Sequence, residues 1–223
     1  MKTSRQAIRL ITVLVGLPLL SNVASLVIFA PLFAPDQDVT SADFQHAGTL
    51  AGVVVLVIEL LALLLIALFL HRERASLKNV IHFRSKRVQT YLVTGLIALL
   101  PTLAAGWVYG QGQSQAGVES DLARLSPGEV LLWYVATPVM AAFLEEIIWR
   151  GYAIPRLRGT WPSLLLASLS FALFHGIFSP LALAATFVHG MVWGWVYQRT
   201  ESTVPSTVLH FLSRYLAFVP GFG

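Results

Sequence analysis

The sequence predicts an all-α protein, a polytopic bundle of about seven transmembrane helices. Hydrophobic residues make up 56% of the 223 residues and charged residues only 12%, whereas a soluble domain carries about 25% charged residues. The mean hydropathy is +0.72. The apolar residues also fall into runs close to the roughly 20 residues that a helix needs to cross a bilayer. These observations together predict a multi-pass protein whose solvent is lipid.

Seven apolar runs predict the helices. In chain order they are 8–34, 49–70, 88–109, 129–155, 163–178, 181–197 and 204–219. The first is longer than the roughly 7 to 15 residues of a signal-peptide core, so we interpret it as a retained span. A strongly basic loop separates the second from the third. Pro155 suits the end of the fourth, because proline disfavours helical geometry in the preceding residue and lacks a backbone donor. The last three runs are short and closely connected.

Charges in the connecting loops predict the orientation of the chain in the membrane. Basic residues lie before the first run and after the second: Lys2, Arg5, Arg9, Arg72, Arg74, Lys78, Arg84, Lys86 and Arg87. The alternate loops are acidic or mixed and contain Asp36, Asp38, Asp43, Glu119, Asp121 and Arg124. Because cytoplasmic loops carry the excess of lysine and arginine, we expect the N-terminus inside and the C-terminus outside. We interpret the net charge of +4 as orienting the protein in a lipid bilayer, with no nucleic acid partner.

One membrane domain, residues 1–223, is expected, because no internal repeat, low-complexity tract or long linker divides the chain. Within it, residues 1–127 supply three N-terminal helices with their loops, and residues 128–223 supply four further helices. The sequence contains no cysteine. Disulfides, a thiolate nucleophile and a cysteine-based metal site are therefore excluded.

Two adjacent carboxyl groups stand out in the fourth run. Glu145 and Glu146 lie in a stretch otherwise nearly free of charge, and Arg150 follows. Ionisable residues within a membrane span are costly and usually mark function. Glu146 and Arg150 are four residues apart on one helix face and can form a buried ion pair that only holds helices together. Glu145 points about 100° away and has no partner in the sequence, so it is the better candidate for a general base.

Two histidines are predicted to reach the depth of Glu145. At 1.5 Å per residue, Glu145 lies about 15 Å from the cytoplasmic end of its helix, and His175 and His210 lie within about two helical turns of that depth. Each histidine alone can equally be an interhelical hydrogen-bonding group. His189 falls at a similar depth, and we assign it a packing or supporting role. Glu59 interrupts the second run, and we expect it to be neutral or hydrogen-bonded and outside the site.

Three short motifs occur in order in the last four predicted helices. Residues 145–150 read Glu-Glu-x-x-x-Arg, residues 171–175 read Phe-x-x-x-His, and His210 follows a Val-Pro-Ser entry at 204–206. These motifs resemble those of the CPBP family of intramembrane proteases, which contains type II CAAX prenyl endopeptidases and bacterial Abi proteins. The resemblance covers residues 131–219 and makes 128–223 a CPBP-like catalytic core. The first three helices add only hydrophobicity.

The resemblance implies a function and a role for each residue. The implied function is that of an intramembrane endopeptidase that hydrolyses a peptide bond near the C-terminus or membrane anchor of a membrane-associated protein or peptide substrate. The implied location is the cell membrane, in a bacterium the inner membrane. Glu145 and His175 would activate water, His210 would stabilise the oxyanion, and Glu146 and Arg150 would support them.

The chain departs from the family at one position. Family members usually carry asparagine four residues after the third-motif histidine, where this chain has Arg214. Arginine also donates hydrogen bonds and stabilises negative charge, but its permanent charge can alter substrate choice or abolish turnover. Arg214 therefore either contacts the substrate or extends along the helix to the membrane surface.

Two alternatives remain open at this point. Glu145, His175 and His210 also form a two-histidine, one-carboxylate zinc set with an open water position. No H-E-x-x-H pair supports a metal, so we predict glutamate-type catalysis without a cofactor and keep a zinc metalloprotease as the alternative. The other alternative is a non-hydrolytic binding, immunity or scaffold protein on a degenerate protease fold, which Arg214 favours.

Overall fold

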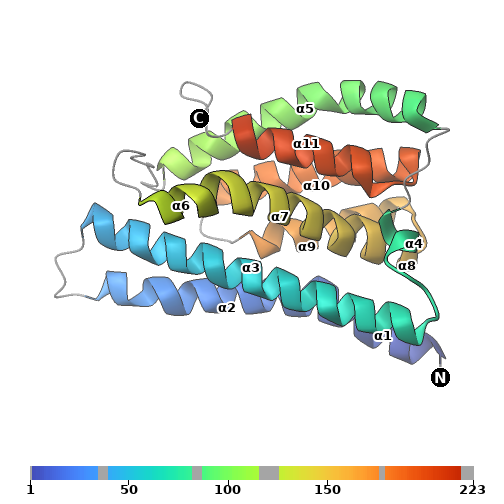
Figure 1. Cartoon of the computed structure of the whole chain (residues 1–223), viewed down its shortest axis with the longest axis horizontal. Coiled ribbons are helices and arrows are strands. Elements are labelled where there is room, and N and C mark those ends of the chain that lie inside the picture. Colours follow the sequence, from blue (N-terminus) through green and yellow to red (C-terminus); the bar gives the residue numbers. More distant parts are fainter. Residues whose placement is uncertain (1, 35–39, 82–86, 116–125, 176–178, 217–223) are drawn as a thin grey trace.

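The computed structural model describes residues 2–34, 40–81, 87–115, 126–175 and 179–216. In this part of the chain all regular elements are helices, and they lie side by side in one bundle (Figure 1). The all-α prediction is therefore confirmed. Three stretches are long and apolar enough to cross a membrane: Ser4–Phe33, His46–Arg72 and Val88–Gln111.

Some sequence predictions fall outside the described residues. They concern the helix ends at 178 and 219 and the loop charges Asp36, Asp38, Arg84, Lys86, Glu119, Asp121 and Arg124.

The first two predicted helices form an antiparallel pair along one edge of the bundle (Figure 1). α1 (Lys2–Ile11) continues through a π-helical turn, η1 (Thr12–Gly16), into α2 (Leu17–Phe29) and a 3-10 turn, η2 (Ala30–Phe33). α3 (Ser41–Arg72) begins after a capping box, in which the Thr40 and Asp43 side chains accept from each other's backbone N–H groups. Leucines and valines on the outer face of this pair are exposed, as expected for helices in lipid.

The third predicted helix lies at the opposite edge of the bundle (Figure 1). A short helix, α4 (Lys78–Ile81), precedes it and was not predicted. α5 (Val88–Gln115) packs against α10 and α11.

The fourth predicted helix is one continuous helical run from Pro127 to Arg156. Its parts are α6 (Pro127–Leu131), η5 (Leu132–Ala136), α7 (Thr137–Glu145), η6 (Glu146–Ala153) and α8 (Ile154–Arg156). The predicted end at 155 is confirmed within one residue. The π-helical segment η6 begins directly after Glu145, and such segments inside helices are frequent at functional sites.

The last three helices are α9 (Trp161–Phe174), α10 (Pro180–Thr200) and α11 (Thr203–Leu216). The prediction that His175 lies within its helix is wrong, because α9 ends at Phe174 and His175 is its C-cap. At 14 residues, α9 is about 21 Å long and shorter than the roughly 30 Å hydrocarbon layer. Its last residue, Phe174, is 3% exposed, so this end of α9 lies inside the bundle.

The core is centred on η6. Every residue from Leu144 to Ile154 is buried, so the helix is surrounded by protein on all sides. Close backbone approach makes this possible. A Cβ atom on Gly151 would lie 2.2 Å from Val80 Cγ1, and one on Gly190 would lie 2.9 Å from Ser168 Cα. The first contact seats α4 against η6, and the second joins α10 to α9.

Candidate active site

Glu145 lies at the junction of three helices. It is 1% exposed. Its Oε2 atom lies 3.4 Å from His175 Nε2 at the end of α9 and 3.6 Å from His210 Nε2 in α11. Its Oε1 atom lies 3.7 Å from an Arg214 guanidinium nitrogen. The structure thus brings together the carboxylate, both predicted histidines and the divergent arginine.

His175 lies at this position because polar side chains of α2 bind the last carbonyl groups of α9. The last carbonyls of a helix have no partner within it, and in a membrane each unsatisfied group costs several kcal/mol. Ser21 donates to Phe174 O at 3.0 Å, and Asn22 donates to Leu173 O at 2.6 Å. Both side chains come from α2. Hydrophobic patterning cannot reveal this tertiary stop, which is why the sequence predicted a longer helix.

The partners of His175 define its tautomer. Its Nδ1 lies 2.9 Å from Phe171 O, and its Nε2 lies 2.9 Å from Arg214 Nη2. A carbonyl oxygen only accepts and a guanidinium only donates. Nδ1 therefore carries the proton, and the Nε2 lone pair accepts from Arg214. In this arrangement His175 is a neutral imidazole whose lone pair faces the site.

Glu146 and Arg150 form the predicted ion pair. Arg150 Nη1 lies 3.0 Å from Glu146 Oε1, and both side chains are almost completely buried. The guanidinium carbon lies 4.3 Å above the Phe171 ring and 5.5 Å from the Trp193 ring, which adds cation–π stabilisation. Arg150 also approaches Gly190 O at 3.5 Å. This pair links η6 with α9 and α10.

His210 bridges the two glutamates. Its Nδ1 lies 3.3 Å from Glu146 Oε1, while its Nε2 faces Glu145. The ring stacks on Trp193, with centroids 4.1 Å apart and an interplanar angle of 24°. Because a carboxylate only accepts, Nδ1 donates to Glu146. A neutral His210 then presents a lone pair to Glu145, and only an imidazolium can donate on that side.

Arg214 points into the site rather than to the membrane surface. Its side chain is 25% exposed, and it contacts both His175 and Glu145. Tyr109 on α5 also interacts with the guanidinium group. The alternative that Arg214 extends away to the extracytoplasmic surface is therefore wrong. The permanent positive charge of Arg214 therefore lies beside Glu145, the candidate base.

Sequence reasoning misplaced one residue of this cluster. Glu59 on α3 is 1% exposed, and its carboxyl group interacts with Glu145 and Arg214. The expectation that Glu59 lies outside the site is therefore wrong. Its isolated charge in an apolar run was the available signal, but nothing in the sequence indicated which helix it faces.

His189 occupies the supporting position assigned to it. Its ring stacks on Trp193 at 4.6 Å between centroids. Its Nε2 lies 3.0 Å from Thr102 O and 3.2 Å from Ser213 Oγ. His189 thereby connects α10 with α5 and α11 behind the cluster.

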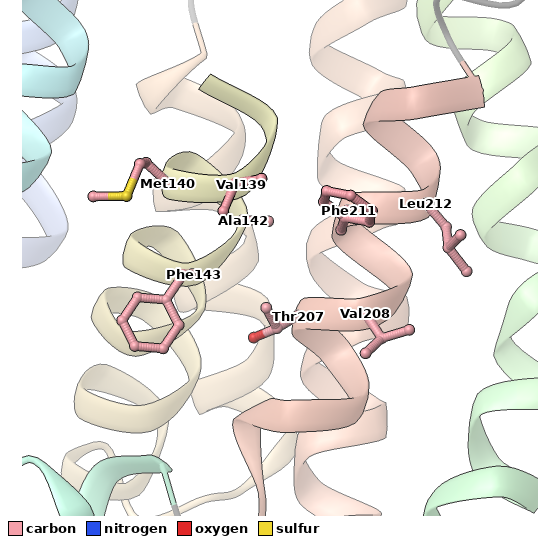
Figure 2. Close-up of a pocket in the computed structure, with 8 residues that line it drawn as sticks. All are labelled: Val139, Met140, Ala142, Phe143, Thr207, Val208, Phe211 and Leu212. Carbon is pink, nitrogen blue, oxygen red and sulfur yellow. The ribbon is translucent and has the colours of Figure 1, made fainter. Parts of the chain in front are cut away.

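An apolar groove runs beside the cluster, between α7 and α11 (Figure 2). Its volume is about 530 Å³. The lining residues are Val139, Met140, Ala142, Phe143, Thr207, Val208, Phe211 and Leu212. Ala142 is one helical turn before Glu145, and Phe211 follows His210, so the groove flanks the two helices that carry these groups.

The donor set does not fit a zinc ion. The His175 lone pair that would bind a metal accepts a hydrogen bond from Arg214, and this guanidinium also lies beside the Glu145 carboxylate. Among the described residues, no group of three or more histidine, aspartate or glutamate side chains is arranged to hold a metal ion.

The chain is thus a helical membrane protein with carboxyl, imidazole and guanidinium groups assembled between its helices. Residues 127–216 match the family described as Type II CAAX prenyl endopeptidase Rce1-like. This segment contains all three motifs, and the match supports its resemblance to the CPBP family of intramembrane proteases. No curated protein and no solved structure matches the chain.

Proposed function

We propose that the protein is an intramembrane endopeptidase that cleaves a membrane-associated protein or peptide near its C-terminus or membrane anchor. The observation that carries this proposal is the contact of the buried Glu145 carboxylate with two imidazoles and one guanidinium group from other helices. Together these groups supply a base and hydrogen-bond donors, which peptide hydrolysis needs.

The proposed mechanism starts from three converging acceptor atoms. His175 Nε2 lies 3.4 Å and His210 Nε2 lies 3.6 Å from Glu145 Oε2. A water molecule held against them donates its protons into the group, and Glu145 takes one as the water oxygen attacks the scissile carbonyl carbon. The same carboxyl group then gives this proton to the leaving amine as the C–N bond breaks. No metal takes part in these steps.

We propose that Arg214, instead of His210, donates the hydrogen bond to the oxyanion. It carries several N–H donors and is the most exposed charged group of the cluster. When substrate enters, Arg214 leaves His175 Nε2 and donates to the carbonyl oxygen as negative charge develops there. The movement also frees the His175 lone pair for water. His210 then orders the water and connects Glu145 to Glu146.

The groove between α7 and α11 supports an apolar substrate segment. Its lining is almost entirely hydrocarbon, and it lies next to the helices of Glu145 and His210 (Figure 2). A prenyl chain or a hydrophobic membrane anchor fits this lining by chemistry. We therefore propose that the groove holds the apolar part of the substrate beside the scissile bond.

We further propose a seven-span topology with the N-terminus in the cytoplasm, in a bacterial inner membrane. Glu73 pairs with Arg9 at 2.7 Å and with Arg156 at 2.5 Å, so the N-terminal basic segment and the basic segment after α3 lie at one end of the bundle. This supports a shared cytoplasmic side. Because the chain has no cysteine, labelling of Lys78→Cys and Ala34→Cys with a membrane-impermeant thiol reagent tests it. Labelling of Lys78→Cys in intact cells would overturn the orientation.

A cleavage assay on purified protein in nanodiscs tests the function. The probes are a prenylated C-terminal peptide with a fluorophore and quencher and its unprenylated counterpart. We expect the wild type to cleave the prenylated peptide. Glu145→Gln should lose cleavage but unfold at the same temperature as the wild type, and Glu201→Gln should cleave like the wild type. The control removes a carboxylate whose side chain is 56% exposed. Full activity in Glu145→Gln would end the assignment of Glu145 as base.

The second candidate is a non-hydrolytic binding or scaffold protein. The observation that favours it is the Arg214 hydrogen bond to His175 Nε2, which occupies the lone pair needed for water activation. In that case the wild type binds the prenylated peptide without cleaving it, and Glu145→Gln binds it with equal affinity.

A further inference from the structure

Glu59 and Glu145 meet in the interior with unsatisfied oxygens. α3 packs against α7, and the buried Glu59 carboxyl group interacts with Glu145. Both Glu59 oxygens and Glu145 Oε2 have no hydrogen-bond donor among the described residues. Because ionised carboxylates only accept, their contact becomes a hydrogen bond only when one of them carries a proton.

The charges around this pair can be counted. The cluster contains three carboxyl groups, on Glu59, Glu145 and Glu146, and two permanent cations, on Arg150 and Arg214. Arg150 is committed to Glu146 at 3.0 Å. Among the described residues of the cluster, Arg214 is therefore the one permanent cation left to balance the carboxyl groups of Glu59 and Glu145.

Like charges in contact in a low-dielectric interior do not both ionise. One proton on the pair makes the cluster neutral, with both histidines uncharged. The charged groups that face Glu59 are Glu145 from α7 and Arg214 from α11, and Tyr109 from α5 contacts the same guanidinium.

We propose that Glu59 is a positioning residue of the active site that shares one proton with Glu145 and thereby keeps Glu145 ready as the base. This inference rests on the proposed function. Before reaction Glu59 is the acid and donates to the Glu145 carboxylate. Glu145 takes a proton from water as the new C–O bond forms, so the pair then holds two protons. One passes to the leaving amine nitrogen as the C–N bond breaks, and the pair returns to one proton.

Infrared spectroscopy of the purified protein in nanodiscs tests proton sharing without substrate. We expect the wild type to show the C=O band of a buried protonated carboxyl group at neutral pH. The band should disappear in Glu59→Gln and in Glu145→Gln, because the remaining carboxyl group then ionises beside Arg214, and it should persist in the control Glu201→Gln. Absence of the band in the wild type, or its persistence in Glu59→Gln, would overturn the proposal.

Cleavage of the prenylated peptide gives the second readout. Glutamine matches the shape and hydrogen-bond donation of the protonated acid but cannot exchange the proton, so Glu59→Gln should fold normally and lose at least about tenfold in kcat. Glu59→Asp keeps the acid and should recover part of the loss. An active wild type with an equally active Glu59→Gln overturns the role of Glu59 and leaves the proposed function intact. An inactive wild type overturns the proposed function, while the infrared result still decides the proton sharing.

Discussion

Replacing Arg150 with alanine is expected to destabilise the protein more than any exposed charge substitution. The arginine is 1% exposed and pairs at 3.0 Å with a completely buried Glu146. Removing one partner of a buried ion pair costs about 3–5 kcal/mol, because the other charge stays buried without compensation. The lost contact with the Phe171 ring, at 4.3 Å, adds up to about 2 kcal/mol. We therefore expect the free energy of unfolding to fall by at least about 3 kcal/mol.

The assay is equilibrium unfolding by SDS in mixed micelles, followed by far-UV circular dichroism. The matched control is the double variant Glu146→Gln/Arg150→Leu, which removes both charges and leaves none unpaired. It should lose less stability than Arg150→Ala, because replacing a whole buried pair by neutral groups is often nearly neutral. The reasoning is refuted if Arg150→Ala is as stable as, or more stable than, the double variant.

Three further predictions follow from contacts of the site and core. Arg214→Ala should lower kcat about 100-fold, whereas Arg214→Asn should retain turnover; equal rates in both variants would contradict an oxyanion role. Asn22→Leu, which exposes a carbonyl before His175, should cost about 1–3 kcal/mol in SDS unfolding and lower kcat; an unchanged kcat would show that the α9 end is held by other contacts. Gly190→Ala, which drives a Cβ to 2.9 Å from Ser168 Cα, should cost about 1–3 kcal/mol, and a stability equal to wild type would exclude the close approach.

Local patterns predicted the helices well. The hydrophobic runs identified each long helical stretch, and the end predicted at 155 lies one residue from Arg156, where the structure places it. The reason given for this end was wrong, because Ile154 keeps helical geometry before Pro155 and the helix continues through the proline. The spacing of Glu146 and Arg150 predicted their ion pair, which is confirmed at 3.0 Å. These features depend on residues within one or two turns of each other. The short α4 was missed because four residues are too few for a periodic signal.

The tertiary contacts of the site could not be predicted from the sequence. Motif order indicated that Glu145, His175 and His210 belong together, but it could not show that Arg214 donates to His175. Nor could it show that α2 and α3, which had been assigned only hydrophobicity, contribute polar side chains. A polar residue in an apolar run signals that a partner exists. It does not say on which helix that partner lies.

The closure of α9 by α2 has a consequence for protein engineering. All three motifs lie within residues 127–216, yet the carbonyls that end α9 bond to Ser21 and Asn22. A fragment cut at the motif boundary would present these carbonyls to hydrocarbon, where no donor replaces them. We therefore expect a fragment limited to residues 127–216 to be less stable than the full chain. Transplanting the catalytic helices into another scaffold would require carrying the first hairpin with them.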